Sequence, residues 1–277
     1  MRIVHTIADL RAARRELNTD IGFVPTMGAL HDGHISLVKR AKAECGSAIA
    51  SIFVNPTQFN DKADFTRYPR TLENDARLLE PAGCDVIFAP DAQEMYPQGF
   101  DTRIDIGSVT TQLEGAMRPG HFAGVATVVA KLFNIVQPAR AYFGQKDAQQ
   151  VVVVRKLVAD LNMPLEIVAA PTLREADGLA MSSRNVHLTA AERAAAPVVY
   201  QALQAVKAAY EAGERDGETL RAIAKQKLSH EPLAIVEYVS VANPRTLDEL
   251  DGVAHDALVS LAARFGKTRL IDNIVLG

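Results

Sequence analysis

Short apolar runs alternate with helix-length segments over the first two-thirds of the chain, and this alternation restricts the fold more than any other feature. Runs with the length of buried strands occupy residues 21–24, 48–54, 85–89, 141–143 and 165–170. Each run is separated from the next by a segment long enough to hold a helix. Strands joined by helices form right-handed βαβ units, which build a parallel sheet. The sequence therefore predicts an α/β fold with a Rossmann-like parallel sheet.

Four segments between these runs have the apolar spacing or the capping residues of helices: residues 35–45, 71–79, 121–136 and 147–161. In the first, Ile35, Val38 and Cys45 share one helix face. Thr71 is suited to be the N-cap of the second helix. Pro138 follows the third helix and is expected to end it.

The pattern changes after Pro171. Thr189 and Glu192 have the spacing of a capping box that opens a helix, and Pro197 is expected to bend or break that helix. A second helix should end near residue 228, and three β-like runs follow at residues 235–241, 258–265 and 269–275. We expect a smaller α+β domain here and divide the chain into residues 1–173 and 174–277.

Composition limits the partners and the compartment. Thirty basic and thirty-three acidic residues give a net charge of −3, which offers no general attraction for nucleic acid or an anionic membrane. The two cysteines, Cys45 and Cys84, form no C-x-x-C pair and are expected to be reduced thiols. No apolar run is long enough for a secretory signal core at the start or for a membrane span. We expect a soluble cytoplasmic protein.

Residues 25–34 (PTMGALHDGH) carry the most informative motif, because they join the first predicted strand to a helix. Gly28 and Gly33 allow the backbone to approach a ligand closely. The helix N-terminus is expected to offer N–H groups to an anion. His31 and His34 could donate to phosphate oxygens and stabilise charge that grows in a phosphoryl-type transition state. A plain glycine turn with solvated histidines is the alternative, and a zinc site would need a third ligand that the sequence does not identify.

H-x-G-H after a strand is similar to the signature of the HIGH-motif nucleotidyltransferases, and the whole segment resembles the pantoate–β-alanine ligase family. Five further segments agree in order and spacing: residues 53–59 (FVNPTQF), 68–71 (YPRT), 113–121 (LEGAMRPGH), 142–150 (YFGQKDAQQ) and 174–185 (READGLAMSSRN). The likeness covers most of residues 20–190 and becomes a similarity of pattern afterwards.

The resemblance implies an ATP-dependent condensation of (R)-pantoate with β-alanine to pantothenate, on the route to coenzyme A. The reaction passes through a pantoyl-adenylate and releases pyrophosphate and then AMP. Because the substrate carboxylate is the nucleophile, the enzyme contributes positioning and charge stabilisation. ATP chemistry implies Mg²⁺. The resemblance also implies a homodimer, and a closing segment at residues 60–68 or in the C-terminal domain.

The resemblance assigns residues to three tasks. Catalysis is assigned to His34, His31, Lys146 and Arg184. ATP binding is assigned to three stretches and one strand end: Met27, Gly28, Ala29, Leu30, His31, Asp32, Gly33 and His34; Gly144, Gln145, Lys146 and Asp147; Met181, Ser182, Ser183 and Arg184; and Leu173. Substrate binding is assigned to two glutamines, Gln58 and Gln150, whose amides both donate and accept hydrogen bonds.

Three other side chains are weaker candidates. Arg118 and His121 could add positive potential to the substrate pocket. Asp75 is the best candidate for a carboxylate ligand of Mg²⁺.

Three other functions are open at this point. Another HIGH-type adenylyltransferase would transfer AMP to a phosphorylated acceptor. A dinucleotide-dependent oxidoreductase lacks support, because no G-x-G-x-x-G follows the first predicted strand. A nucleotide-sensing protein would bind ATP without turning it over.

Overall fold

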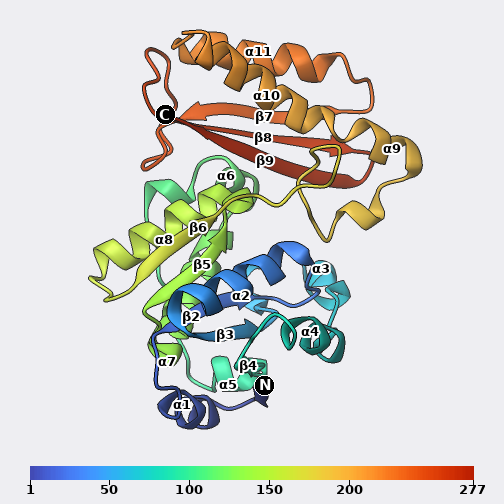
Figure 1. The fold of residues 1–277 in the computed structure, drawn as a ribbon. Helices are drawn as coiled ribbons and strands as arrows, with labels where there is room; N and C mark the ends of the chain where they lie inside the picture. Colours follow the sequence, from blue (N-terminus) through green and yellow to red (C-terminus); the bar gives the residue numbers. More distant parts are fainter. The chain divides into compact units, whose positions relative to one another are not determined.

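The computed structural model describes residues 1–277, except for the side chain of Lys62, and the chain divides into two compact units (Figure 1). The first unit contains Met1–Gly144 and Val153–Ala170, and the second contains Gln145–Val152 and Pro171–Gly277. Helix α8 (Ala148–Asp160) contributes its first turn to the second unit and its remainder to the first. No helix in the described residues is long and apolar enough to cross a bilayer.

The first unit is built on a parallel sheet whose described strands lie in the order β1-β4-β3-β2-β5-β6. Their bounds are Arg2–Val4 (β1), Ile21–Thr26 (β2), Ser47–Ile52 (β3), Val86–Phe88 (β4), Arg140–Gly144 (β5) and Glu166–Ala170 (β6). The chain runs outward from β2 to β4 and then returns to place β5 on the other side of β2. Ligands of such sheets bind at the carboxyl ends of the strands, where the strand order reverses. The predicted parallel sheet is confirmed.

The four predicted helices of this region are α2 (Asp32–Cys45), α4 (Leu72–Leu79), α7 (His121–Val136) and α8. Shorter helical segments not predicted are α3 (Lys62–Arg67), α5 (Ala92–Met95), α6 (Glu114–Met117), η1 (Pro56–Gln58) and η2 (Ser108–Thr110). Strand β1 and helix α1 (Ile7–Arg15) were also missed. A local signal for α1 exists, because the Thr6 side chain caps the helix by accepting from the N–H of Asp9.

Two neighbouring residues of β2 show how helices cover both faces of the sheet. A Cβ at Gly22 would lie 2.7 Å from the Cβ of Ala41 in α2, so only glycine permits this close approach. The ring of Phe23 makes an edge contact with Phe133 of α7, with the centroids 6.4 Å apart. Because successive strand residues point to opposite faces, α2 and α7 pack on opposite sides of the sheet.

The second unit packs helices on a small antiparallel sheet of order β7-β8-β9. Its strands are Ile235–Ala242 (β7), Ala257–Phe265 (β8) and Thr268–Leu276 (β9), and its helices are α9 (Ala190–Ala195), α10 (Val198–Glu211) and α11 (Gly217–Ser229). Two short 3₁₀ segments, η3 (Gln145–Asp147) and η4 (Asn185–His187), also belong to it. The predicted α+β character is confirmed.

Two local predictions for the second unit are also confirmed. Thr189 and Glu192 form a capping box at the start of α9, with each side chain bonded to the other residue's backbone N–H. Pro197 separates α9 from α10. Both outcomes depend on residues close together in the chain, which explains why the sequence was sufficient.

Candidate functional site

The loop after β2 lies at the carboxyl end of a central strand, and Asp75 of α4 holds it in place. Gly28 and Ala29 have positive φ angles of 83° and 52°. The Asp75 carboxylate accepts the N–H of Ala29 at 3.1 Å and that of Leu30 at 2.9 Å. The tight turn between β2 and α2 is therefore stabilised by a carboxylate from another helix.

His31 and His34 form a capping box at the start of α2. The Nδ1 of His31, the N-cap residue, accepts from the N–H of Gly33 at 3.1 Å. The Nδ1 of His34 accepts from the N–H of His31 at 3.4 Å, and the two ring centroids are 4.2 Å apart. Since both Nδ1 atoms are acceptors, each neutral ring carries its proton on Nε2. The motif thus fixes the tautomer of both imidazoles.

The sequence predicts backbone N–H groups that are free to bind an anion at the start of this helix, and the structure differs. The N–H groups of Ala29 and Leu30 are taken by Asp75, and that of Gly33 by His31. The N–H of His34 donates to the carbonyl of His31 at 2.8 Å. A phosphate would have to compete with these internal acceptors, so side-chain donors gain importance over the backbone.

Asp75 was the candidate Mg²⁺ ligand, and its surroundings do not favour that role. The side chain is fully buried, and the Thr71 hydroxyl donates to it at 3.1 Å in addition to the two backbone N–H groups. Thr71 is the N-cap of α4 as predicted, but its side chain makes no cap bond. Among the described residues, no group of three His, Cys, Asp or Glu side chains converges to hold a metal. These residues do not fit a protein-ligated magnesium site.

Gln58 lies beside the β2–α2 loop. Its Nε2 donates to the Sδ of Met27 at 3.2 Å, a weak acceptor, and its Oε1 accepts from Asn55 at 3.0 Å. Asn55 is itself oriented by Tyr96, whose hydroxyl donates to Asn55 Oδ1 at 2.8 Å. Burial raises the pKa of Tyr96 further above neutral pH. The amide of Gln58 is therefore held by a buried polar network that the sequence did not reveal.

Arg118 and His121 meet at the backbone of Gln58. His121 is buried, and its Nδ1 lies 2.8 Å from the carbonyl oxygen of Gln58. Its Nε2 lies 3.2 Å from the guanidinium of Arg118, which can only donate. The neutral ring therefore accepts from Arg118 at Nε2 and donates to Gln58 from Nδ1. Both residues are placed to orient Gln58.

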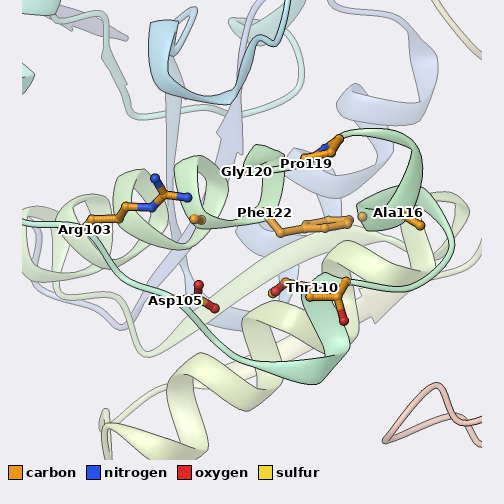
Figure 2. A pocket seen from close by; sticks show the side chains of 10 residues that line it. Arg103, Asp105, Thr110, Ala116, Pro119, Gly120 and Phe122 are labelled. Atoms are coloured by element: carbon orange, nitrogen blue, oxygen red, sulfur yellow. The ribbon is translucent and has the colours of Figure 1, made fainter.

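Two cavities adjoin this region of the first unit. The larger, about 440 Å³, is lined by residues that include Gln58, His121 and the segment 100–103. The smaller, about 270 Å³, shares Arg103 with it (Figure 2). In Figure 2 the Phe122 ring extends across this smaller cavity. The sequence did not identify Phe100 or Arg103, because no motif marks them.

Other predicted residues belong to the second unit. Lys146 is half-buried and Asp147 is exposed, both in η3. Gln150 of α8 is half-buried, whereas Gly144 ends β5 in the first unit. Leu173 is 40% exposed, and its carbonyl accepts from the N–H of Met181 at 2.9 Å.

Residues 181–184 form a turn in the second unit, in which Met181 and Ser182 are half-buried. The Ser182 hydroxyl accepts from the N–H of Arg184 at 3.2 Å, while Ser183 and Arg184 are exposed. The guanidinium and the hydroxyls are of a kind that binds phosphate oxygens. The predicted residues are thus divided between the units: Met27–His34 and Gln58 belong to the first, and Gln145–Asp147 and Met181–Arg184 belong to the second.

Comparison with known proteins identifies the family. The sequence profile described as pantoate-beta-alanine ligase matches residues 2–275. A pantothenate synthetase of Herpetosiphon aurantiacus is 60% identical over 277 residues, with both chains covered completely. The crystal structure of pantothenate synthetase from Thermus thermophilus is similar over 99% of each chain, with a TM-score of 0.93 and 49% identity. The pantoate-beta-alanine ligase of Francisella tularensis, crystallised with beta-gamma ATP and beta-alanine, has a TM-score of 0.80 and 38% identity, over 99% of this chain and 97% of that chain. The chain belongs to the pantoate–β-alanine ligase family.

Proposed function

We propose that this chain condenses (R)-pantoate with β-alanine at the expense of ATP, through a pantoyl-adenylate. The observation that carries the proposal is the paired-histidine loop at the carboxyl end of β2, with the amide of Gln58 in contact with Met27 of the same loop. The family match over residues 2–275 supports the same activity. The Francisella tularensis relative, whose structure holds an ATP species and beta-alanine, supports these substrates for this chain.

The first half-reaction needs charge stabilisation rather than an enzyme nucleophile. A carboxylate oxygen of pantoate attacks the α-phosphorus of ATP and forms a new P–O bond. The bond from that phosphorus to the bridging oxygen breaks, and pyrophosphate leaves with the electron pair. Imidazoles whose protons lie on Nε2, as in His31 and His34, can donate to the oxygens that gain charge. Hydrogen bonding by His34 without full proton transfer is sufficient for this role.

The second half-reaction forms the amide bond. The amine of β-alanine attacks the acyl carbon of the adenylate, the C–O bond to phosphate breaks, and AMP leaves while the amine loses a proton. We assign pantoate binding to Gln58 and Gln150. Lys146 and Arg184 are assigned to the phosphates, with Lys146 as a point charge and Arg184 as a planar fork.

We further propose that the domains of residues 1–173 and 174–277 have different roles. The first binds ATP and pantoate, and the second closes over the water-labile adenylate.

Mg²⁺ would enter with the triphosphate, held mainly by phosphate oxygens and water. A homodimer is expected from the family resemblance. The two cysteines are free, buried thiols, which supports a cytoplasmic location.

The half-reactions can be separated by measuring pyrophosphate and AMP while each substrate is omitted in turn. Pyrophosphate release should require ATP and pantoate but not β-alanine, and AMP release should require all three. Rapid AMP formation without pantoate would exclude the adenylate scheme. Pyrophosphate formation only with a phosphorylated acceptor would indicate another adenylyltransferase, and ATP binding without either product would indicate a nucleotide sensor.

A further inference from the structure

Two adjacent residues near the C-terminus contact the Gln145–Asp147 segment and the hairpin that precedes Met181–Arg184 in the second unit. Asp272 and Asn273 lie in β9, and both are buried. Asp272 is on the side of the strand that carries Leu270 and Leu276 of the hydrophobic core. Because neighbouring strand residues point in opposite directions, Asn273 faces the other side. A buried carboxylate and a buried amide in succession need polar partners.

The amide of Asn273 is occupied by the segment that carries Lys146. Its Nδ2 donates to the carbonyl oxygens of Gln145 and Lys146, each at 2.9 Å. Its Oδ1 accepts from the Nε2 of Gln145 at 3.0 Å. The two bonds from Nδ2 thus fix the backbone on both sides of the Cα of Lys146, and the third holds the side chain of Gln145. This geometry requires two donors and one acceptor, which asparagine supplies.

Asp272 holds the hairpin that precedes Met181–Arg184. Its two carboxylate oxygens accept hydrogen bonds from the two terminal nitrogens of the Arg174 guanidinium, at 2.5 and 3.0 Å. Arg174 also donates to the carbonyl of Gly178 at 3.1 Å and lies 3.9 Å from the ring centroid of Tyr200. A β-bridge joins Arg174 to Ala180, directly before the second loop begins. The bidentate ion pair between Arg174 and Asp272 therefore fixes the base of that hairpin to β9.

We propose that Asn273 and Asp272 are positioning residues for ATP, with Asn273 placing Lys146 and Asp272 placing the Met181–Arg184 loop through Arg174. This inference rests on the proposed ATP-dependent function. A lysine that neutralises phosphate acts over a distance set by its backbone, so small shifts of Gln145 and Lys146 weaken its contribution. Neither Asn273 nor Asp272 needs to touch the nucleotide.

Substitution of Asn273 tests the proposal. Asn273→Asp keeps the size and shape but replaces both donors with acceptors that face two carbonyl oxygens. The KM for ATP should rise about tenfold to a hundredfold, as expected when two or more hydrogen bonds are lost. The KM for pantoate should stay within about twofold. Arg174→Lys, which keeps a positive charge beside Asp272 but removes the bidentate geometry, should also raise the KM for ATP selectively.

Val275 provides the matched control, because it is 56% exposed on the same strand and the same side as Asn273. Val275→Ala should leave both KM values unchanged. If Asn273→Asp does not fold, Asn273→Ser, which retains one donor, should show a smaller rise in the KM for ATP. Calorimetry with a non-hydrolysable ATP analogue then tests the positioning role and the proposed ATP-dependent function separately. An unchanged ATP affinity in the Asn273 variants, or equal losses for ATP and pantoate, would overturn the positioning role, whereas a wild-type protein that does not bind the analogue would overturn the proposed function.

Discussion

At the residue scale, His34 combines a structural bond with a proposed catalytic one. Its Nδ1 accepts from the N–H of His31, while the proton of the neutral ring lies on Nε2. We predict that His34→Ala slows adenylate formation about 10²- to 10³-fold, since one donor aimed at developing charge contributes that much. Single-turnover measurement of pyrophosphate release checks this. Added pantoyl-adenylate should restore much of the second half-reaction.

A matched variant separates the two tasks of His34. Glutamine at this third helical position can still reach back to the N-cap backbone, so His34→Gln should retain the wild-type melting temperature. His34→Ala loses the hydrogen bond to the N–H of His31 and should be less stable by about 0.5–1.5 kcal/mol. Turnover should fall in both variants. If His34→Ala forms the adenylate at a rate within threefold of wild type, the assigned role of His34 is wrong, and His31 or Lys146 must stabilise the charge.

Gln58 provides a second test at the residue scale. Its Nε2 contacts only a thioether in the network described above, and a carboxylate or hydroxyl of pantoate would be a better acceptor. Gln58→Ala should weaken pantoate binding about tenfold to a hundredfold and leave ATP affinity nearly unchanged. Gln150→Ala should do the same. Titration of each ligand separately is the measurement, and parallel losses for ATP and pantoate would point to a misplaced pocket.

At the scale of elements, α4 supports the β2–α2 loop through Asp75. Asparagine at this position would present an NH₂ group to one of the donors now bound, so Asp75→Asn should cost on the order of 1–3 kcal/mol in the free energy of unfolding. Turnover should fall because the loop carrying both histidines loses its support. The Mg²⁺ concentration for half-maximal activity should not change. A selective rise in that concentration, with normal stability, would restore the metal-ligand assignment.

At the scale of the whole molecule, acid should weaken the second unit through Glu237. Its side chain is 8% exposed and pairs with Arg264 and Arg269. Burial acts to raise the pKa of Glu237, but the two guanidinium groups prevail and lower it. A carboxyl whose folded pKa is lowered contributes stability above its unfolded pKa of about 4.3, and this contribution is lost as the pH falls through the folded value.

Denaturant unfolding of wild type and Glu237→Gln checks this prediction. The variant should be less stable by about 1–3 kcal/mol at neutral pH, because hydrogen bonds to a charged group are lost. The difference should disappear below the folded pKa of Glu237. Glu166→Gln is a suitable control, since the Glu166 side chain is 63% exposed and its bond to Arg140 should contribute only about 0–1 kcal/mol. A stability difference that persists unchanged in acid would exclude the ionic explanation.

Features that depend on residues close together in the chain were predictable from the amino-acid sequence. Short apolar and β-like runs predicted the strands of both sheets except β1, and local chemistry predicted the capping box of α9 and the break at Pro197. The motif around His31 and His34 was also visible, because strand, loop and helix start follow one another. The shortest elements, such as α5 and α6, were not predictable, since a single turn has no period to recognise.

The contacts between the site and residues distant in the chain follow from how the helices and strands pack. Asp75 holds Ala29 across 46 residues, His121 reaches the carbonyl of Gln58 across 63, and Asn273 binds Gln145 across 128. These partners depend on where α4, α7 and β9 pack, and no spacing in the sequence encodes that placement. From the sequence alone, an Asp or Asn is recognisable only as a polar residue. Its role depends on whether the fold buries it and on which donors and acceptors the fold brings to it.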